Sequence, residues 1–249
     1  MRTTTENRQF NKLPLKIMYN KKQQNKMKSN YPFLTLLFDL DGVIIDSEPQ
    51  YDRFWNSQGE SHGHGHNFAG KVKGLTMSQI MSKFFYQFST DEQNKIIDEC
   101  VKFETAMECP LIAGAEVFIK NLKLQGVKTG LVTSSDDIKL ERIMEKFDMR
   151  SWFDTVVTAN RVTRSKPDPQ GYLLAAEDLK SDIKDCMVFE DSFAGIEAGR
   201  NAEMKVVALA TTNSRRAIQA TGNADLIIDN FVNFDYNDCL RLYNKYLKI

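Results

Sequence analysis

The sequence predicts an α/β fold: a parallel β-sheet with helices on both faces, and a small group of helices inserted after the first strand. Short apolar runs recur along the chain, and segments of helical periodicity lie between them. The runs are apolar on both faces, which is typical of strands buried in a parallel sheet. One long stretch interrupts this alternation and shows no strand pattern. Alternating strands and helices favour a sheet wound by right-handed crossovers.

The candidate strands and helices follow one another along the chain. The predicted strands span residues 34–38, 129–133, 155–158, 186–189, 205–209 and 226–228. Apolar residues mark the candidate helices between them, namely Val117, Leu122 and Leu124; Ile138, Ile143, Met144 and Phe147; and Tyr172, Leu173, Leu174 and Ala176. This order supplies the crossover helices that parallel pairing requires.

The stretch without a strand pattern spans residues 48–111, and Pro49 and Pro110 lie close to its ends. We expect it to form a small helical domain, inserted into a core domain that combines residues 31–47 with residues 112–249. The apolar residues that recur in the insert at near-helical spacing are Phe84, Phe85, Phe88, Ile96, Ile97, Val101 and Phe103.

Residues 1–30 differ in composition from the rest of the chain. They are rich in Lys, Arg, Asn and Gln, contain a single acid (Glu6), and lack the apolar core of a secretory signal. This composition is typical of a disordered leader, and we expect the segment to be dispensable for stability and activity. The alternatives are an organelle presequence, a nucleic-acid-binding arm, or translation that starts at Met18 or Met27.

The charge balance argues against some classes of partner. Lys plus Arg and Asp plus Glu both total 33, so nothing global indicates nucleic acid or a membrane surface. No apolar stretch approaches the ~18 residues of a membrane span. We expect a cytoplasmic monomer, with Cys100, Cys109, Cys186 and Cys239 as reduced, buried thiols.

Two acids stand close together where the first predicted strand ends, in the sequence Phe38-Asp39-Leu40-Asp41-Gly42. Strand alternation puts Asp39 and Asp41 on one face, at the strand end where open α/β sheets bind ligands. Two close carboxylates repel each other unless a cation or a shared proton relieves them. The arrangement indicates a catalytic or metal site, and a surface Asp-Gly turn is the structural alternative.

Polar residues also follow later predicted strands. Thr133 and Ser134 bring hydroxyl groups and backbone amides that can cradle phosphate oxygens. Lys166, held between strand and helix by two prolines, can neutralise phosphate charge. Glu190 and Asp191 place two more acids at a strand end, and Mg²⁺ commonly takes one or two protein carboxylates. Helix caps and a solvated lysine are the structural alternatives.

Together these segments resemble the four sequence motifs of the haloacid dehalogenase superfamily, in the family's order. The likeness extends from about residue 34 to the C-terminus, and it implies a Rossmann-like core with the helical cap of subclass I. Asp46-Ser47-Glu48-Pro49 is similar to a segment of the β-phosphoglucomutase-like phosphatases. The matching motifs are Asp39-Leu40-Asp41-Gly42-Val43, Thr133-Ser134, Lys166-Pro167-Asp168-Pro169 and Glu190-Asp191-Ser192 with Ala194-Gly195-Ile196-Glu197-Ala198-Gly199.

The resemblance implies a phosphatase that acts on a small phosphorylated metabolite, such as a sugar phosphate. By this likeness Asp39 attacks phosphorus and becomes an aspartyl phosphate. Asp41 acts first as general acid and then as general base. Thr133 and Lys166 hold the phosphoryl oxygens, and Ser134 contributes its backbone amide.

The same resemblance implies Mg²⁺ as the cofactor. Its ligands would be the carboxylates of Asp39 and Asp191 and the backbone carbonyl of Asp41, with Glu190 bound directly or through water. Glu48 would bind the substrate or its phosphate.

A sugar-phosphate mutase is the main alternative within the family. Mutases place a histidine after the first motif and an arginine in the cap, where Tyr51 and Met77 stand here. Dehalogenases lack the second acid, so Asp41 argues against that class. A non-catalytic binding module on the same fold is an alternative of another class, although all the motif residues are intact.

The histidines of this chain, His62, His64 and His66, alternate with glycine inside the insert. Alternating histidines can bind zinc or copper. No cysteine or acid cluster lies nearby apart from Glu60, so a glycine-rich flexible loop is the favoured interpretation.

Overall fold

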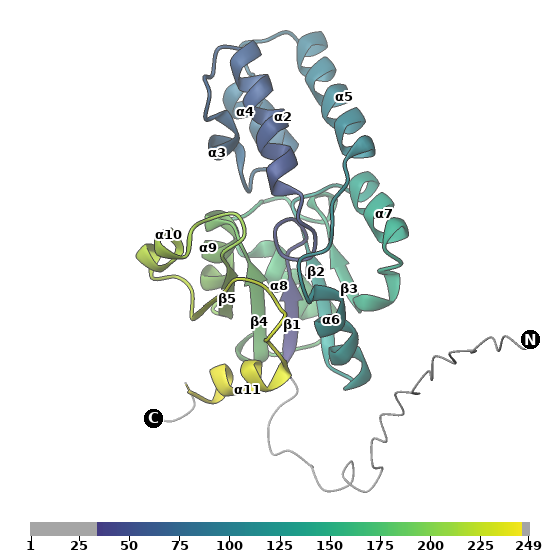
Figure 1. Cartoon of the computed structure of the whole chain (residues 1–249), viewed down its shortest axis with the longest axis vertical. Coiled ribbons are helices and arrows are strands. Elements are labelled where there is room, and N and C mark those ends of the chain that lie inside the picture. Colours follow the sequence, from purple (N-terminus) through teal and green to yellow (C-terminus); the bar gives the residue numbers. More distant parts are fainter. Residues whose placement is uncertain (1–33, 246–249) are drawn as a thin grey trace, which may run out of the picture. The chain divides into compact units, whose positions relative to one another are not determined.

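The computed structural model describes residues 34–245, except for the side chain of Glu48. The predicted leader, residues 1–30, lies outside the described residues. Within the described range, one parallel sheet has the strand order β3-β2-β1-β4-β5-β6 (Figure 1). The strands are β1 (Thr35–Phe38), β2 (Lys128–Val132), β3 (Thr155–Val157), β4 (Cys186–Glu190), β5 (Lys205–Leu209) and β6 (Leu226–Ile228).

Helices connect successive strands and fill the insert between β1 and β2. The insert contains α2 (Glu48–Ser61), α3 (Phe68–Val72), α4 (Met77–Phe84) and α5 (Thr90–Ala106). The remaining helices are α6 (Ala115–Leu124), α7 (Asp137–Lys146), α8 (Gln170–Asp178), α9 (Phe193–Asn201), α10 (Arg215–Thr221) and α11 (Tyr236–Lys245). Short 3-10 turns are η1 (Arg150–Trp152), η2 (Ala159–Arg161) and η3 (Ile183–Asp185).

The predicted strands agree with the observed ones to within one residue at each end. β5 and β6 have the predicted bounds, β2 lies one residue earlier, and β4 extends to Glu190. All neighbouring strands pair in parallel, and Phe38 of β1 stands between Leu131 of β2 and Phe189 of β4. The predicted α/β class is therefore confirmed.

Alternate residues of the central strand β1 face opposite sides of the sheet. Leu36 and Phe38 belong to an apolar cluster that also contains residues of α6, α7 and α11. Leu37 belongs to a second cluster, which contains residues of α8, α9 and α10. Because helices cover both faces, the strands must be apolar on both sides, and this explains the pattern in the sequence.

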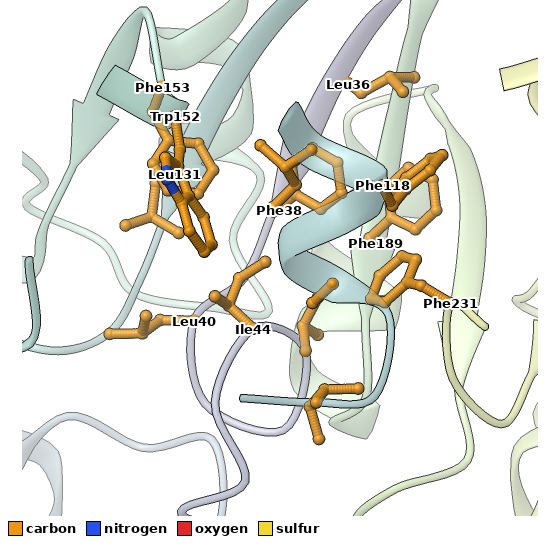
Figure 2. Close-up of a cluster of buried hydrophobic side chains, with 14 of the residues drawn as sticks. Leu36, Phe38, Leu40, Ile44, Phe118, Leu131, Trp152, Phe153, Phe189 and Phe231 are labelled. Atoms are coloured by element: carbon orange, nitrogen blue, oxygen red, sulfur yellow. The ribbon is translucent and has the colours of Figure 1, made fainter. Parts of the chain in front are cut away.

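Aromatic rings fill the centre of the first cluster (Figure 2). Phe38 stacks on Phe189 with ring centroids 4.7 Å apart, and Phe118 stacks on Phe231 at 5.1 Å. An edge contact between Phe38 and Phe118, at 6.2 Å, joins the two pairs. Such ring pairs contribute about 0.5–1.5 kcal/mol beyond the burial of their area. The cluster therefore fixes the two strands whose ends carry the acids.

Local sequence signals set the starts of two helices in the insert. Thr76 caps α4 and Ser89 caps α5, and Gln79 and Glu92 complete the two capping boxes. Residues 48–111 contain helices and no strand, as predicted. That they form a separate domain stays a prediction. The insert has its own apolar cluster of Trp55, Phe68, Ala69, Val72, Ile80, Met81, Phe85, Ile96 and Cys100.

The two chain segments that join the insert to the sheet are hydrogen-bonded to each other. The backbone N–H of Asp46 donates to the carbonyl of Pro110 at 2.8 Å, and that of Ile112 donates to the carbonyl of Ile44 at 2.9 Å. An antiparallel bridge lies between these two bonds. The insert therefore leaves and re-enters the sheet region through one paired connection.

In the described part of the chain, none of the helices combines the length and apolar character needed to cross a membrane. The four cysteines are free and buried, as predicted. Burial raises the pKa of the Cys186 thiol to about 12, with further repulsion from Asp185 and Asp182, so this thiol is protonated at neutral pH.

The apolar patterns mark the right helical segments but mistake some exposed residues for buried ones. Val117 and Leu124 of α6 are 64% and 85% exposed, and Ile138 of α7 is 69% exposed. Because a helix turns once in 3.6 residues, Val117 and Leu124 lie opposite the face that packs on the sheet. The buried faces carry Ala115, Phe118, Ile119 and Leu122 in α6, and Leu140, Ile143 and Met144 in α7.

We predict that Leu122→Ala and Leu124→Ala, two substitutions on one helix, differ sharply in stability. Leu122 is fully buried, so its truncation should lower the free energy of unfolding by about 2–5 kcal/mol. Leu124 is 85% exposed, so its truncation should change it by less than about 0.5 kcal/mol. Urea denaturation followed by circular dichroism measures both. Equal effects would show that α6 packs with a different face.

Candidate active site

The strand order reverses at one point in the sheet, between β1 and β4. From β1 the chain builds outward through β2 and β3, then returns to start β4 on the other side of β1. Asp39 follows β1 and Asp191 follows β4, so both acids lie at this point. The backbone N–H of Asp39 donates to the carbonyl of Phe189 at 3.0 Å. Ligands in open α/β sheets bind at the carboxyl ends of strands where the order reverses.

Asp39 and Lys166 form a buried ion pair at this position. Lys166 Nζ lies 2.5 Å from Asp39 Oδ1 and 2.6 Å from Glu190 Oε1. It also donates to the carbonyl of Val132, the last residue of β2, at 3.1 Å. The side chains of Lys166 and Asp39 are 8% and 11% exposed, and that of Glu190 is 1% exposed. One lysine therefore joins the ends of β1, β2 and β4.

Both oxygens of the Glu190 carboxylate are engaged with the protein. Oε1 accepts from Lys166 and from the hydroxyl of Tyr172, the latter at 3.1 Å. Oε2 accepts from the backbone N–H groups of Asp191 and Ser192, at 2.9 and 3.0 Å, and from the Ser192 hydroxyl. A Cβ added at Gly195 would lie 1.7 Å from Oε1, so only glycine fits there. Through these contacts Glu190 holds both Lys166 and the start of α9 in place.

Burial raises the pKa of Asp39 to about 7. Attraction and a hydrogen bond from Lys166 oppose this shift, while repulsion from Glu190 and Asp41 adds to it. Burial lowers the pKa of Lys166, but attraction to Asp39 and Glu190 outweighs it and holds this pKa well above its usual value. A further cation beside Asp39 would favour its ionised form.

Asp41 has a different set of partners from Asp39. Its Oδ2 accepts from Lys139 Nζ at 2.7 Å and from the Ser135 hydroxyl at 3.2 Å. Its Oδ1 accepts from the Ser47 hydroxyl. Burial raises the pKa of Asp41, but attraction to Lys139 and the three hydrogen bonds outweigh it and hold the pKa below the usual value. Asp41 is therefore ionised at neutral pH.

The end of β2 brings hydroxyl groups to the same pocket. Thr133 is 5% exposed, and its backbone N–H donates to the carbonyl of Val157 at 2.9 Å. Its hydroxyl oxygen accepts from the backbone N–H of Ser135 at 3.0 Å. Thr133 and Ser134 line the pocket together with Asp39, Asp41, Lys166 and Asp191.

Asp191 lies against the loop that follows β1. Its Oδ2 accepts from the Thr212 hydroxyl, and its backbone carbonyl accepts from Asn213 Nδ2 at 3.0 Å. A Cβ added at Gly42 would lie 2.0 Å from this same Oδ2, and Gly42 has a φ of +74°. Glycine is thus required at position 42 both by the backbone and by the approach of the acid. Ser192, rather than Asp191, caps α9.

The donors at this edge of the sheet fit a magnesium ion. Within residues 34–245, no three His, Cys, Asp or Glu side chains are grouped so that they could hold a metal by themselves. Mg²⁺ usually keeps several waters and takes only one or two carboxylates. Asp39 and Asp191 with the backbone carbonyl of Asp41 match that need. Glu190 is less suited as a direct ligand, because both its oxygens accept hydrogen bonds from the protein.

Lys139 is a residue of the site that the sequence motifs do not reveal. Lys139 lies on α7, is 7% exposed and points its ammonium group at Asp41. A signal was present, because Lys139 precedes Ile143 by four residues and so falls on the buried stripe of its helix. The insert contributes further pocket residues that the motifs do not cover, namely Tyr51, Asp52, Trp55, Lys73, Gly74, Leu75, Met77, Ile80, Ile97, Cys100, Val101 and Glu104.

Two further predictions concern Glu48 and the histidine run of the insert. The side chain of Glu48, at the start of α2, lies outside the described residues. His64 stacks on Phe68 at 4.7 Å, and His66 Nδ1 lies 2.6 Å from Glu60 Oε1. The histidine run therefore packs on the insert's own aromatic residues, and two of its members point at different neighbours.

A family model described as haloacid dehalogenase-like hydrolase matches residues 36–209. Hexitol phosphatase B of Escherichia coli K12 is 28% identical over 189 residues, which cover 73% of this chain and 85% of that protein.

Solved structures of the same architecture are also similar. A haloacid dehalogenase hydrolase of family IA from Entamoeba histolytica matches with a TM-score of 0.74 and 22% identity, and the match covers 85% of this chain and 99% of that one. The β-phosphoglucomutase of Clostridium difficile matches with a TM-score of 0.71 and 22% identity, over 87% of this chain and 99% of that one. At these identities the two structures are evidence for the fold.

We predict that Gly42→Ala weakens Mg²⁺ binding, because its Cβ would displace the Asp191 carboxylate. Gly126→Ala is the matched control: its φ of +75° is nearly the same, and no atom lies within 4 Å of the added Cβ. Both substitutions should cost about 1–2 kcal/mol of stability through the left-handed backbone. Only Gly42→Ala should weaken Mg²⁺ binding, by about tenfold or more in isothermal titration calorimetry. Equal Mg²⁺ affinities in the two variants would show that Asp191 does not bind the metal.

Proposed function

Since the chain belongs to the haloacid dehalogenase-like hydrolases and is a phosphatase of that family, we propose that it hydrolyses the phosphate ester of a small sugar or polyol through an aspartyl phosphate. The observation that carries this proposal is the buried group of Asp39, Lys166 and Glu190 at the point where the strand order reverses. A carboxylate held beside a buried ammonium group can approach a phosphate ester, since the lysine attracts the phosphoryl oxygens.

The protein's own residues can carry out the two chemical steps. An oxygen of Asp39 attacks phosphorus and the ester bond breaks. Asp41, which is ionised in the free protein, takes up a proton from solvent when the negatively charged ester binds beside it, and passes this proton to the leaving oxygen. In the second step Asp41 takes a proton from water, which attacks the aspartyl phosphate and releases inorganic phosphate and free Asp39. Lys166, the Thr133 hydroxyl and the Ser134 backbone amide offset charge on the transferred group.

Mg²⁺, held by Asp39, Asp191 and the backbone carbonyl of Asp41, would neutralise charge on the phosphoryl oxygens. Asp39 also needs a cation for another reason. Its pKa is raised to about 7 by burial, whereas a nucleophilic carboxylate must be ionised. Glu190 and Thr212 would act by holding Lys166 and Asp191 in place.

Charges in the pocket favour a substrate with one phosphate and an uncharged remainder. Each lysine of the pocket lies beside an acid: Lys166 beside Asp39, Lys139 beside Asp41, and Lys73 beside Asp52 at 2.9 Å. Carboxylates outnumber lysines among the lining residues, which include Asp39, Asp41, Asp52, Glu104, Asp136 and Asp191 against Lys73, Lys139 and Lys166. A second phosphate would meet this excess of negative charge. Hydroxyl groups can donate to the same carboxylates.

A relative whose name states its substrate class supports the same choice. Hexitol phosphatase B is by its name a phosphatase of hexitols. Two pocket residues argue against a mutase, which must hold a second phosphate. Met77, which lines the pocket where a mutase would carry arginine, cannot bind phosphate, and the hydroxyl of Tyr51 donates to Glu104 Oε1 at 2.5 Å.

We predict that Asp39→Asn lowers the rate of 4-nitrophenyl phosphate hydrolysis in Mg²⁺ by about a thousandfold or more, because an amide cannot act as the nucleophile. Asp98→Asn, an exposed substitution on α5, is the control and should keep the parent rate. Excess chelator should abolish the parent activity, and added Mg²⁺ should restore it. A variant that keeps a tenth of the parent rate would show that Asp39 is not the nucleophile. A parent protein inactive on phosphate esters would favour the non-catalytic binding module.

We also predict hydrolysis rather than phosphoryl transfer between sugar positions. The protein is incubated with β-glucose 1-phosphate, Mg²⁺ and a catalytic amount of glucose 1,6-bisphosphate. Inorganic phosphate and glucose 6-phosphate are then measured in parallel. Phosphate should accumulate without glucose 6-phosphate, because each lysine that lines the described pocket is paired with an acid. Rapid formation of glucose 6-phosphate without phosphate release would identify a mutase.

A further inference from the structure

We propose that Lys139 is a positioning residue that fixes the carboxylate of Asp41 and ties it to the helical insert through the ring of Tyr51. This inference rests on the proposed function, in which Asp41 protonates the leaving oxygen. It assigns a role to a residue outside the four motifs, and it links the acid to the insert, which lines the same pocket.

Lys139 completes a set of donors that allows Asp41 one orientation. The Ser47 hydroxyl donates to Oδ1, and the Ser135 hydroxyl and Lys139 Nζ donate to Oδ2. The three donors come from three segments: the loop before α2, the loop after β2, and the first turn of α7. A carboxylate held from three directions cannot turn without breaking a bond. The lysine bond, at 2.7 Å and between opposite charges, is the strongest type among them.

The ammonium group of Lys139 is itself held by the insert. Its Nζ lies 4.7 Å from the centroid of the Tyr51 ring, and Tyr51 belongs to α2. The Tyr51 hydroxyl donates to Glu104 Oε1 on α5 at 2.5 Å. A cation over an aromatic face is attracted by the ring, and more strongly when both are desolvated. Glu104, Tyr51, Lys139 and Asp41 therefore form one continuous contact from the insert to the acid.

Stability alone is a poor explanation for a lysine in this place. Taking an ammonium group out of water costs several kcal/mol, and a buried ion pair often contributes no more than apolar side chains of the same volume. Two serine hydroxyls already donate hydrogen bonds to the Asp41 carboxylate. What the lysine adds is a fixed direction for the acid, set jointly by α7 and by the insert.

Fixing the acid matters most when the leaving oxygen is a poor leaving group. A nitrophenolate departs without help, whereas the oxygen of phenol or of an alcohol needs a proton delivered in the transition state. A misplaced Asp41 should therefore slow phenyl phosphate far more than 4-nitrophenyl phosphate. A general loss of folding or of phosphate binding would slow both substrates equally.

The test compares kcat/KM for phenyl phosphate and 4-nitrophenyl phosphate, in Mg²⁺, for Lys139→Met and the parent. The ratio of the two values should shift against phenyl phosphate by about tenfold or more in the variant. Lys139→Arg should restore the ratio of the two kcat/KM values most of the way to that of the parent, because arginine again places a cation over the Tyr51 ring. Lys146→Met, an exposed substitution on the same helix, should keep the parent ratio.

Tyr51 provides a second pair of variants that does not alter the lysine. Tyr51→Leu removes the ring and should shift the ratio in the same direction as Lys139→Met. Tyr51→Phe keeps the ring, loses only the bond to Glu104, and should shift it less. If Lys139→Met fails to fold, as judged by circular dichroism, the tyrosine pair decides the question alone.

The outcomes separate this proposal from the proposed function. An equal fall on both substrates, or an unchanged ratio in Lys139→Met and Tyr51→Leu, would overturn the role of Lys139 while leaving the phosphatase intact. A parent protein that hydrolyses neither substrate with Mg²⁺ would instead overturn the phosphatase itself.

Discussion

The structure of the site depends on keeping three charges, those of Asp39, Lys166 and Glu190, together at the largely buried floor of the pocket. Removing one member of a buried pair leaves an uncompensated charge, at a cost of about 3–5 kcal/mol. The surrounding chain is arranged to avoid this cost. Glu190 accepts from two backbone amides at the start of α9, and α9 can approach it only because residue 195 has no side chain. The contacts that pack α9 against the sheet are thus the same contacts that hold the buried charges in place.

Much of the fold follows from short-range patterns in the sequence. Strands buried on two faces are apolar throughout, and in β1 the alternation of Leu36, Leu37 and Phe38 serves two separate clusters. The buried sides of α6 and α7 were harder to predict, because Val117, Leu124 and Ile138 are apolar yet exposed. A helix covered by the sheet along only part of its circumference can carry apolar residues elsewhere at little cost.

The site was predictable where it follows strands and not where it depends on packing between helices. Asp39, Thr133, Lys166 and Asp191 follow strands or lie in the loops beyond them, so the parallel sheet alone brings them to one edge. Lys139 reaches Asp41 only because α7 lies where its first turn faces the pocket. A lysine on an otherwise apolar stripe was the available sign. The partner of such a lysine depends on the tertiary arrangement, which a single sequence does not contain.

The backbone hydrogen bonds that pair Asp46 with Pro110 and Ile44 with Ile112 allow the insert and the sheet to change independently in evolution. A segment that starts and ends at adjacent, hydrogen-bonded positions can be lengthened, shortened or replaced without moving a strand of the sheet. Asp39 and Lys166 are then retained while the part of the pocket that the insert lines changes. Related proteins can in this way differ in the phosphate ester that they accept while the residues at the strand ends stay the same.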